Sequence, residues 1–339
     1  IKVVNSTLQL LANESGEISS GKGVNFPGVQ IDLPCLTDKD KSDIELGVSL
    51  GVDWIAMSFV RSANDYNLIQ DELNKLDAVI PVIAKIEKPE AINNLGSIIQ
   101  AFDGILVARG DLGVEMPLSE LPILQKKIVN ECLQKQKPVI IATQMLESMI
   151  DNPLPTRAEV SDVASAIYDG SDAIMLSGET AVGDFPLESI RMMKSITVNV
   201  EKELLKDDEF NRFIEIPSKN DPKKSICYSA YQMSKDLAIK VMVIMTESGD
   251  TGNTMSSFRP NTAIIAMTPN KNVFRRLSLS WGVIPVQVKK FKSTDQMLAF
   301  NKKFLIDRGI IKKGNLFIMT AGVPVGVAGT TNMIKIDMA

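Results

Sequence analysis

Apolar and polar positions follow each other along the chain in a repeating order of short apolar runs and helical segments. Five apolar runs end abruptly in polar or charged residues, and short runs of this kind are typical of buried strands. They occupy residues 54–58, 82–86, 105–108, 139–142 and 173–177. Around them lie segments with the period of an amphipathic helix, at residues 37–50, 63–76, 89–101, 120–136, 157–169 and 186–205. This alternation predicts parallel strands joined by helical crossovers.

Two α/β architectures contain such units in a row: a (β/α)8 barrel and an open doubly wound sheet. Polar residues follow the carboxyl end of every apolar run, which is where barrel enzymes build their active sites. An open sheet would gather them at one switch point instead, so we expect a barrel. Since five strands cannot close a barrel of eight, we expect the full protein to be longer than this chain, which begins with Ile1.

Further regions flank this series. The first 34 residues have no helical period and look like strands and turns, and residues 206–222 are rich in charge and indicate a linker. A second α/β series follows, with helices predicted at 224–237, 252–258, 272–280 and 295–308 and strands at 240–246, 263–268, 283–288, 315–320 and 333–338. We therefore predict the end of a small β domain (1–34), the later strands of a barrel (35–205) and a C-terminal α/β domain (206–339).

The amino-acid composition excludes several kinds of function and site. The 339 residues suffice for two domains, and a net charge of −4 without a basic stripe argues against nucleic acid as a partner. No apolar run is long enough to cross a membrane. Histidine is absent, which excludes Ser-His-Asp and Cys-His triads and histidine zinc sites. The cysteines at 35, 132 and 227 lie far apart and are predicted to be reduced structural thiols.

Charged residues at the ends of two neighbouring strands form the first candidate site. Lys85 and Glu87 lie two residues apart, so both side chains share one face of a strand while Ile86 faces the helices. Asp111 follows the next strand, and a carboxylate pair of this kind suits Mg²⁺. The alternative is an ion network of Lys85, Glu87, Arg109 and Asp111 that serves the structure alone.

Two other candidate sites contain hydroxyl groups. Thr143, Ser177 and Glu179 end the next two strands, where they could bind an anion, relay a proton or cap the following helices. In the second domain, the loop of residues 246–252 lies between a strand and a helix. Its hydroxyl and N–H groups at Thr246, Ser248, Gly249 and Thr251 could form a phosphate cradle, although its two acidic residues would oppose a dianion, or the loop could be an ordinary turn.

Several motifs in fixed order resemble those of the pyruvate kinase family, over nearly the whole chain. In the barrel region they are Lys85-Ile-Glu87, Ala108-Arg-Gly-Asp-Leu-Gly113, Ala142-Thr-Gln-Met-Leu-Glu-Ser-Met149, Pro155-Thr-Arg-Ala-Glu159, Asp162-Val-Ala164 and Met175-Leu-Ser-Gly-Glu-Thr180. Lys22-Gly-Val-Asn25 resembles the exit from the family's lid domain. Thr246-Glu-Ser-Gly249 and Gly326-Val-Ala-Gly-Thr-Thr-Asn332 resemble loops of its C-terminal effector domain.

The resemblance implies transfer of a phosphoryl group from phosphoenolpyruvate to ADP, giving pyruvate and ATP in the last step of glycolysis. By motif, Lys85 would stabilise the transferring group, and Glu87 and Asp111 would hold Mg²⁺ or Mn²⁺. The N–H groups of Gly110 and Asp111, together with Thr143, would bind the substrate carboxylate and phosphate. Thr143, Ser177 and Glu179 would lie near the route by which the enolate is protonated.

The resemblance also implies a K⁺ ion, a homotetramer, and a cytoplasmic or plastid-type location. The K⁺ ligands would belong to the first three barrel strands, which this chain lacks. A phosphorylated effector would bind Thr246, Ser248, Gly249 and Thr251. The loop of residues 321–328 lacks the Trp and Arg of members activated by fructose bisphosphate, so we expect no strong activation by that ligand.

Two other functions are compatible with these motifs. A Mg²⁺-dependent aldolase on a phosphoenolpyruvate-binding barrel would also use a carboxylate pair around an enolate, but it would need neither ADP nor the second α/β domain. A regulatory homologue without catalysis would bind sugar phosphates through the loop of residues 246–252. The intact set of Lys85, Glu87, Asp111 and Thr143 favours the kinase over this regulator.

Overall fold

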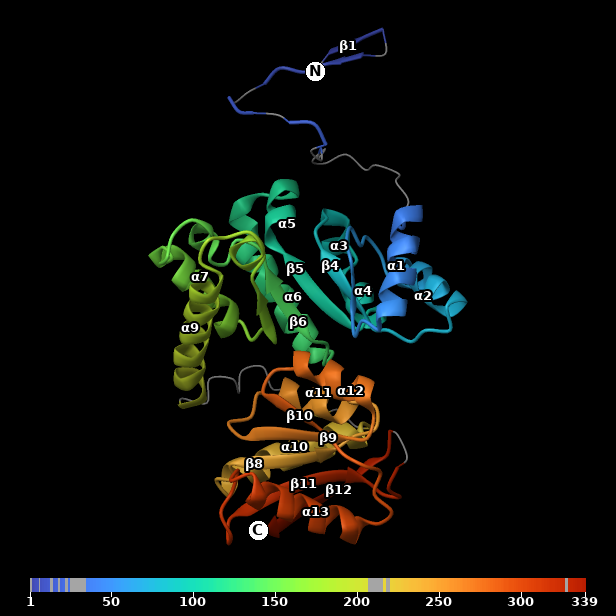
Figure 1. Ribbon diagram of the computed structural model, residues 1–339, viewed down its shortest axis with the longest axis vertical. Coiled ribbons are helices and arrows are strands. Elements are labelled where there is room, and N and C mark those ends of the chain that lie inside the picture. The colour runs from blue at the N-terminus through green and yellow to red at the C-terminus, as the bar shows by residue number, and fades with distance from the viewer. Residues whose placement is uncertain are drawn as a thin grey trace.

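The computed structural model describes residues 2–5, 7–12, 15–17, 19–21, 24, 35–206, 216–217, 220–326 and 329–339. Two α/β domains follow one another along the long axis of the molecule, here called the first domain (35–206) and the second domain (220–339) (Figure 1). Ahead of them, strands β1 (Lys2–Val4) and β2 (Thr7–Gln9) pair antiparallel, in agreement with the strands predicted there. Most of the Lys22–Asn25 motif and of the predicted linker lies outside the described residues.

The first domain contains one sheet of five parallel strands in the order β3-β4-β5-β6-β7. Sequence order equals spatial order, as it does around a (β/α)8 barrel. The strands are β3 (Ile55–Met57), β4 (Val82–Ile86), β5 (Gly104–Ala108), β6 (Val139–Ala142) and β7 (Ala173–Met175). The main helices are α1 (Asp38–Leu50), α2 (Asn64–Lys75), α3 (Pro89–Asn93), α4 (Leu95–Ala101), α6 (Leu121–Gln134), α7 (Arg157–Tyr168) and α9 (Pro186–Lys206).

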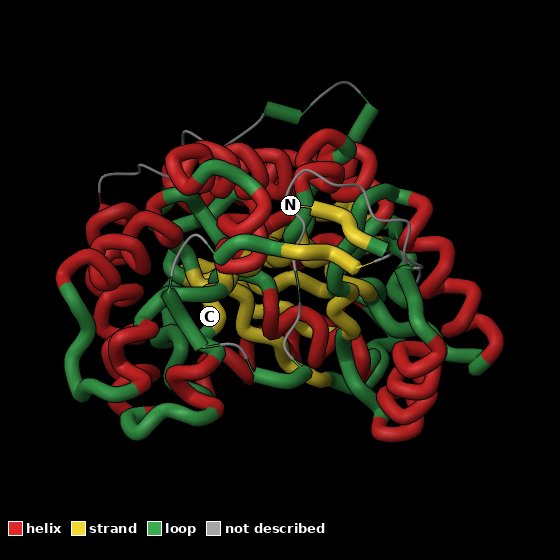
Figure 2. Tube along the Cα trace, turned by 90° about the horizontal axis from the view of Figure 1, so that it is seen from above, coloured by secondary structure: helices red, strands yellow, loops and turns green. Residues whose placement is uncertain are grey.

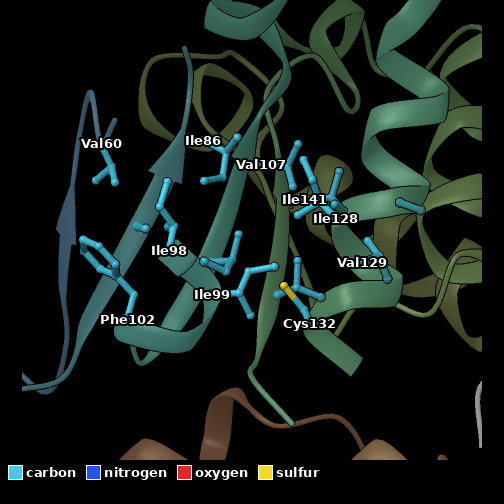
Figure 3. Close-up of a cluster of buried hydrophobic side chains, with 14 of the residues drawn as sticks. Val60, Ile86, Ile98, Ile99, Phe102, Val107, Ile128, Val129, Cys132 and Ile141 are labelled. Atoms are coloured by element: carbon cyan, nitrogen blue, oxygen red, sulfur yellow. The ribbon is translucent and has the colours of Figure 1, made fainter. Parts of the chain in front are cut away.

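The two faces of this sheet bury different side chains. Ile105 and Val107 of β5 point to the helices and join the large core, whereas Leu106 and Ala108 belong to a separate cluster on the other face. Figure 3 shows how the helix-facing side chains fill the layer between strands and helices. In β4 the same alternation turns Ile86 toward the helices, as predicted. Lys85 alternates with Ile86 and therefore shares the opposite face with Ile83.

Local sequence signals set the helix ends. Thr37 and Asp40 form a capping box at α1, Gly51 ends that helix at a φ of 70°, and Thr156 and Glu159 form the predicted capping box at α7. The helix predicted at 89–101 is divided at Asn94 into α3 and α4. Short helices absent from the prediction follow β5, β6 and β7: α5 (Arg109–Glu115), the 3₁₀ helices Leu118–Glu120 and Glu147–Ile150, and α8 (Gly178–Ala181).

The second domain has three layers. Its sheet has the order β10-β9-β8-β11-β12, and only β12 is antiparallel to its neighbour. Helix α13 packs on one face of this sheet, while α10 and α11 pack on the other. Seen from above, with the two domains overlapping, strands lie toward the middle of the molecule and helices toward its outside (Figure 2). The elements are α10 (Pro222–Asp236), β8 (Val241–Met245), α11 (Asp250–Ser257), β9 (Ala263–Thr268), α12 (Lys271–Arg276), a 3₁₀ helix (Leu277–Leu279), β10 (Val283–Gln287), α13 (Thr294–Asp307), β11 (Leu316–Gly322) and β12 (Thr331–Met338).

Polar contacts join the two domains at the amino end of the first sheet, away from the predicted site. Arg259 forms a buried ion pair with Asp172 and donates a hydrogen bond to the carbonyl of Gly170 at 2.7 Å. The Trp281 indole donates a hydrogen bond to Glu201 of α9 at 2.6 Å. In the described part of the chain, no helix has both the length and the apolar character needed to cross a bilayer.

Candidate active site

The Lys85 ammonium group is held at the carboxyl end of β4 by two oxygen acceptors. Its Nζ lies 2.5 Å from Oε1 of Glu87 and donates a hydrogen bond to Oγ of Ser58 at 2.9 Å. The other Glu87 oxygen accepts a hydrogen bond from the Phe59 N–H at 2.8 Å. The Glu87 side chain is 1% exposed, whereas that of Lys85 is 25% exposed. A buried carboxylate thus orients a cation that remains accessible from one side.

Asp111 lies in the first turn of α5, directly after β5. Strands β4 and β5 are neighbours, so Glu87 and Asp111 follow adjacent strands at the same edge of the sheet. The side chain of Asp111 is exposed and forms no hydrogen bond or ion pair with any residue that the structure describes. Within the described ranges, no three acidic or cysteine side chains cluster closely enough to hold a metal. Two carboxylates fit Mg²⁺, which keeps water and substrate oxygens as its other ligands.

Thr143, directly after β6, is hydrogen-bonded to the start of α5. Its Oγ1 accepts a hydrogen bond from the Gly110 N–H at 2.7 Å and donates one to the Ala142 carbonyl at 2.5 Å. Its φ is +71°, and Gln144 follows at +53°. Positive φ is unusual for a β-branched residue and marks a turn that its surroundings impose. The alternative reading of Thr143 as a helix cap is wrong, because no helix begins after it until residue 147.

Arg109 contacts this turn and pairs with Asp162, which is not a member of the predicted ion network. Its guanidinium contacts both carboxylate oxygens of Asp162 at 2.7 Å. It also donates to the carbonyls of Thr143 and Gln144 at 2.8 and 3.2 Å. The proposed ion network of Lys85, Glu87, Arg109 and Asp111 is therefore wrong as a unit, because only its Lys85–Glu87 pair forms among the described residues.

Glu179 is 3% exposed and has backbone partners on two loops. Its Oε1 accepts a hydrogen bond from the Leu146 N–H at 3.0 Å, and its Oε2 accepts one from the Ser177 N–H at 2.8 Å. These bonds place Ser177 at the start of α8, where its side chain makes no cap hydrogen bond. The carboxylate thus links the loop after β6 to the loop after β7.

The loop of residues 246–252 is closed by its own hydroxyl groups. Thr246 Oγ1 accepts a hydrogen bond from the Gly249 N–H at 2.9 Å, and Ser248 Oγ accepts one from the Asp250 N–H at 3.4 Å. The buried Thr251 hydroxyl lies 2.6 Å from that of Thr331. Gly249 has a φ of +94°, and a Cβ there would lie 3.2 Å from Val273. Glycine is therefore required at this position.

Thr246, Ser248 and Thr251 of this loop, but not Gly249, line a pocket of about 600 Å³ that includes open solvent. Glu247 and Asp250, which oppose an anion, belong to its lining. So do basic residues that the sequence did not bring together with the loop: Lys223, Lys289 and Lys290. Both positively and negatively charged side chains therefore line this pocket.

Two partners of the first site were missed from the sequence. The sequence identifies Ser58 only as the last residue of the run at 54–58, although its hydroxyl accepts a hydrogen bond from Lys85. Asp162 was part of a motif without a role, although it neutralises Arg109 across 53 residues. The position of Ser58 at a strand end was a usable signal, since the other site residues share it. No local pattern pairs Arg109 with Asp162.

Comparisons with known proteins agree with this architecture. The profile "Pyruvate kinase, barrel domain" matches residues 2–190, and "Pyruvate kinase, alpha/beta domain" matches residues 224–337. Curated pyruvate kinases of Staphylococcus aureus strains USA300, NCTC 8325 and COL are each 46% identical over 329 residues. The match covers 96% of this chain and 55% of each relative, so the chain spans about half their length. Its five parallel strands are part of a (β/α)8 barrel, and the chain belongs to the pyruvate kinase family.

Proposed function

We propose that the protein containing this chain transfers the phosphoryl group of phosphoenolpyruvate to ADP, giving pyruvate and ATP. The main support for this proposal is the placement of Lys85, whose ammonium group is held by Glu87 and Ser58 at the carboxyl end of β4. Phosphoryl transfer depends on positioning and charge neutralisation, which this chain offers without any histidine. Family membership and the match to curated pyruvate kinases support the same reaction.

In this proposal Lys85 is preorganised for the negative charge that develops on the transferring group. Its hydrogen bonds to Glu87 and Ser58 fix the ammonium before substrate arrives, so little reorganisation is needed during the reaction. Its 25% exposure leaves one side open for phosphate oxygens. The Thr143 hydroxyl and the N–H groups of Gly110 and Asp111 would bind the carboxylate and phosphate of the substrate. For this, the Gly110 N–H would exchange its hydrogen bond to Thr143 Oγ1, and the Thr143 hydroxyl its bond to the Ala142 carbonyl, for bonds to substrate oxygens.

Glu87 and Asp111 would hold Mg²⁺ or Mn²⁺. When bound, the divalent cation neutralises charge on the transferring group and orients substrate oxygens. Asp111 supports this assignment because it is exposed and lacks a hydrogen bond or ion pair among the described residues. A K⁺ ion would bind residues that this chain does not contain.

Protonation of the enolate would occur near Thr143 and Ser177. Both are hydroxyl residues at the ends of neighbouring strands, β6 and β7. Glu179 would act through its backbone hydrogen bonds, which set the position of Ser177 and of the loop after β6. Because this carboxylate is buried and accepts a hydrogen bond from each of two loops, it would hold the loops in place.

The pocket in the second domain is our proposed effector site. Thr246, Ser248 and Thr251, which line the pocket, would bind a phosphate group together with Gly249 of the same loop. Lys223, Lys289 and Lys290 would supply positive charge. Glu247 and Asp250 line the same space and argue against strong activation by fructose bisphosphate, a bis-phosphorylated anion. We further propose a homotetramer, on the basis of family membership alone.

The test is pyruvate formation from phosphoenolpyruvate by the full-length protein, with and without ADP, Mg²⁺ and K⁺. We expect turnover only when both ADP and Mg²⁺ are present. Pyruvate formed without ADP would mean that the phosphoryl group passes to water, which would contradict a kinase. No pyruvate from a complete, folded protein would also contradict the kinase, and would leave the aldolase, which needs an aldehyde as a second substrate, and the phosphate-binding regulator. Adding fructose bisphosphate to the same assay tests the effector site, where a sigmoid-to-hyperbolic shift would contradict our expectation.

A further inference from the structure

We propose that Arg109 is a positioning residue of the proposed phosphoryl-transfer site, which it serves by holding the turn at Thr143 and Gln144. The inference rests on the proposed function, because it concerns how the groups assigned to substrate binding are kept in place. Arg109 itself does not contact the substrate in this proposal. It acts on the backbone of the turn and, through the next residue, on the Thr143 hydroxyl.

The turn needs an external support. Thr143 and Gln144 have consecutive positive φ values of +71° and +53°, although neither is glycine. A β-branched residue rarely adopts this conformation, so contacts elsewhere must stabilise it. The carbonyl groups of both residues accept hydrogen bonds from one Arg109 nitrogen, Nη2, at 2.8 and 3.2 Å. The same nitrogen lies 2.9 Å from the sulfur of the next residue, Met145.

A guanidinium group is suited to this role and an ammonium group is not. Its planar fork presents several N–H groups in fixed directions, so it can serve the turn while pairing with a carboxylate. Asp162 supplies that carboxylate at 2.7 Å and neutralises the charge of a side chain that is only 12% exposed. The Asp162 pair thereby fixes the plane of the guanidinium against the two carbonyls.

The same segment also holds the Thr143 side chain. Gly110 directly follows Arg109, and its N–H donates to Thr143 Oγ1 at 2.7 Å. The start of α5 therefore contacts the turn in two ways. The Arg109 side chain donates hydrogen bonds to the carbonyls of Thr143 and Gln144, and the Gly110 N–H donates one to the Thr143 hydroxyl oxygen. A shift of Arg109 would move Thr143 relative to the Gly110 and Asp111 N–H groups. These are the groups assigned to the substrate carboxylate and phosphate.

The test compares the full-length wild type with Arg109→Lys, which keeps the charge but loses the planar fork. We expect kcat to fall by about 10²-fold, since a small misplacement of substrate-binding groups costs this much. Mn²⁺ affinity should stay at the wild-type value, because Glu87 and Asp111 are unchanged. Arg308→Lys, the same change at an exposed position of the second domain, is the control and should keep wild-type kcat.

Chemical rescue separates positioning from a general loss of stability. In Arg109→Ala, added guanidinium ion at non-denaturing concentration should recover at least about tenfold of the lost kcat, whereas methylammonium should not, because only the planar ion can reproduce the fork. A folded Arg109→Lys with kcat within about threefold of the wild type would overturn the inference. So would equal rescue by both ions.

A second variant covers failure of Arg109→Lys to fold. Asp162→Asn keeps a neutral acceptor beside the guanidinium but loosens it, and kcat should then fall by about tenfold with unchanged Mn²⁺ affinity. Wild-type kcat in this variant would overturn the inference. An inactive wild type would instead contradict the proposed function, so the two failures are distinguishable.

Discussion

Arg259 of the second domain and Asp172 of the first form an ion pair that is shielded from solvent on both sides. Nη1 of Arg259 lies 3.0 Å from Oδ1 of Asp172, and the two side chains are 1% and 6% exposed. Asp172 also accepts hydrogen bonds from the N–H groups of Val139 and Trp281. The guanidinium further lies 5.2 Å from the centre of the Trp281 ring. The Arg259–Asp172 ion pair thus connects the amino end of the first sheet to the second domain.

Arg259→Met should lower the free energy of unfolding by about 3–5 kcal/mol, because it leaves the Asp172 carboxylate buried without its cation. Urea denaturation of the full-length protein, followed by fluorescence and circular dichroism, measures this loss. Arg275→Met is the control, since Arg275 also pairs across the domains, with Asp53, but both side chains are exposed to about 40%. The control should cost less than about 1 kcal/mol. Equal losses in the two variants would contradict the importance of burial.

Glu159 should make stability depend on pH at the start of α7. Burial alone would raise the pKa of this carboxyl, but hydrogen bonds from Ser148 and Thr156 outweigh it and lower the pKa below its ordinary value of 4.5. A carboxyl with a depressed folded-state pKa stabilises the fold above the unfolded-state pKa. This stabilisation is lost as the pH falls through the folded-state pKa. Glu159→Gln should therefore lower the melting temperature at pH 7, and the difference from the wild type should shrink below about pH 4.5.

The matched control is Asp40→Asn at the capping box of α1. The pKa of Asp40 is also lowered, chiefly by hydrogen bonds from Thr37, so its pH dependence should have the same sign. Glu159 accepts two further hydrogen bonds, one from the Ser148 N–H and one from the Ser148 hydroxyl, and Asp40 has no counterpart of these among the described residues. The effect of Asp40→Asn at pH 7 should therefore be the smaller one. A Glu159→Gln difference that grows on acidification would refute the assignment.

The three cysteines are free, and the structure predicts that their thiols react slowly. Burial, with Asp65 nearby, raises the pKa of Cys35 to about 11, and burial raises that of Cys227 to about 12. Burial also raises the pKa of Cys132. Because the thiolate is the reactive form, alkylation at pH 7.5 should be at least about 100-fold slower than for a free cysteine. Iodoacetamide labelling read by mass spectrometry should modify Cys35 first, since it alone is only partly buried. Labelling of Cys132 at the rate of Cys35 would contradict this order.

The sequence predicted the strands of the first domain well because each is a short apolar run that ends in polar residues. It also predicted the side of β4 that carries Lys85, since alternation along a strand is local. The sequence does not predict α5 because Gly110 and Gly113 lower helix propensity there. A hydrogen bond from the Gly110 N–H to Thr143, at the end of β6, holds the start of this helix.

Contacts between distant segments explain what was missed in the site. The sequence predicts a network of Arg109 with charged residues at the ends of two neighbouring strands, but its partner is Asp162, on another helix. A motif identifies Glu179 as a candidate, but its hydrogen bonds from the Leu146 and Ser177 N–H groups depend on how two loops approach each other. Such pairings require the positions of whole elements, which local patterns do not contain.

Lys85→Met tests the proposed catalytic group directly. Removing a preorganised cation should lower kcat by about 10²–10³-fold, while the similar volume of methionine keeps the packing of β4. The rate of pyruvate formation measures the loss, with circular dichroism as the test of folding. Ser58→Ala is the matched variant, because it removes one acceptor of the same ammonium group and leaves Glu87 in place.

The two variants should differ in size and in kind. Loss of one neutral hydrogen bond is worth about 0.5–1.5 kcal/mol, so Ser58→Ala should reduce kcat by about two- to tenfold. If Lys85 serves the structure alone, Lys85→Met should unfold the protein or retain near-normal kcat in the folded fraction. Because Lys85→Met also leaves the buried Glu87 carboxylate without its cation, the melting temperature should fall as well. A kcat lower by about 10²–10³-fold in protein that remains folded at the assay temperature is expected only when the ammonium acts on the reaction itself.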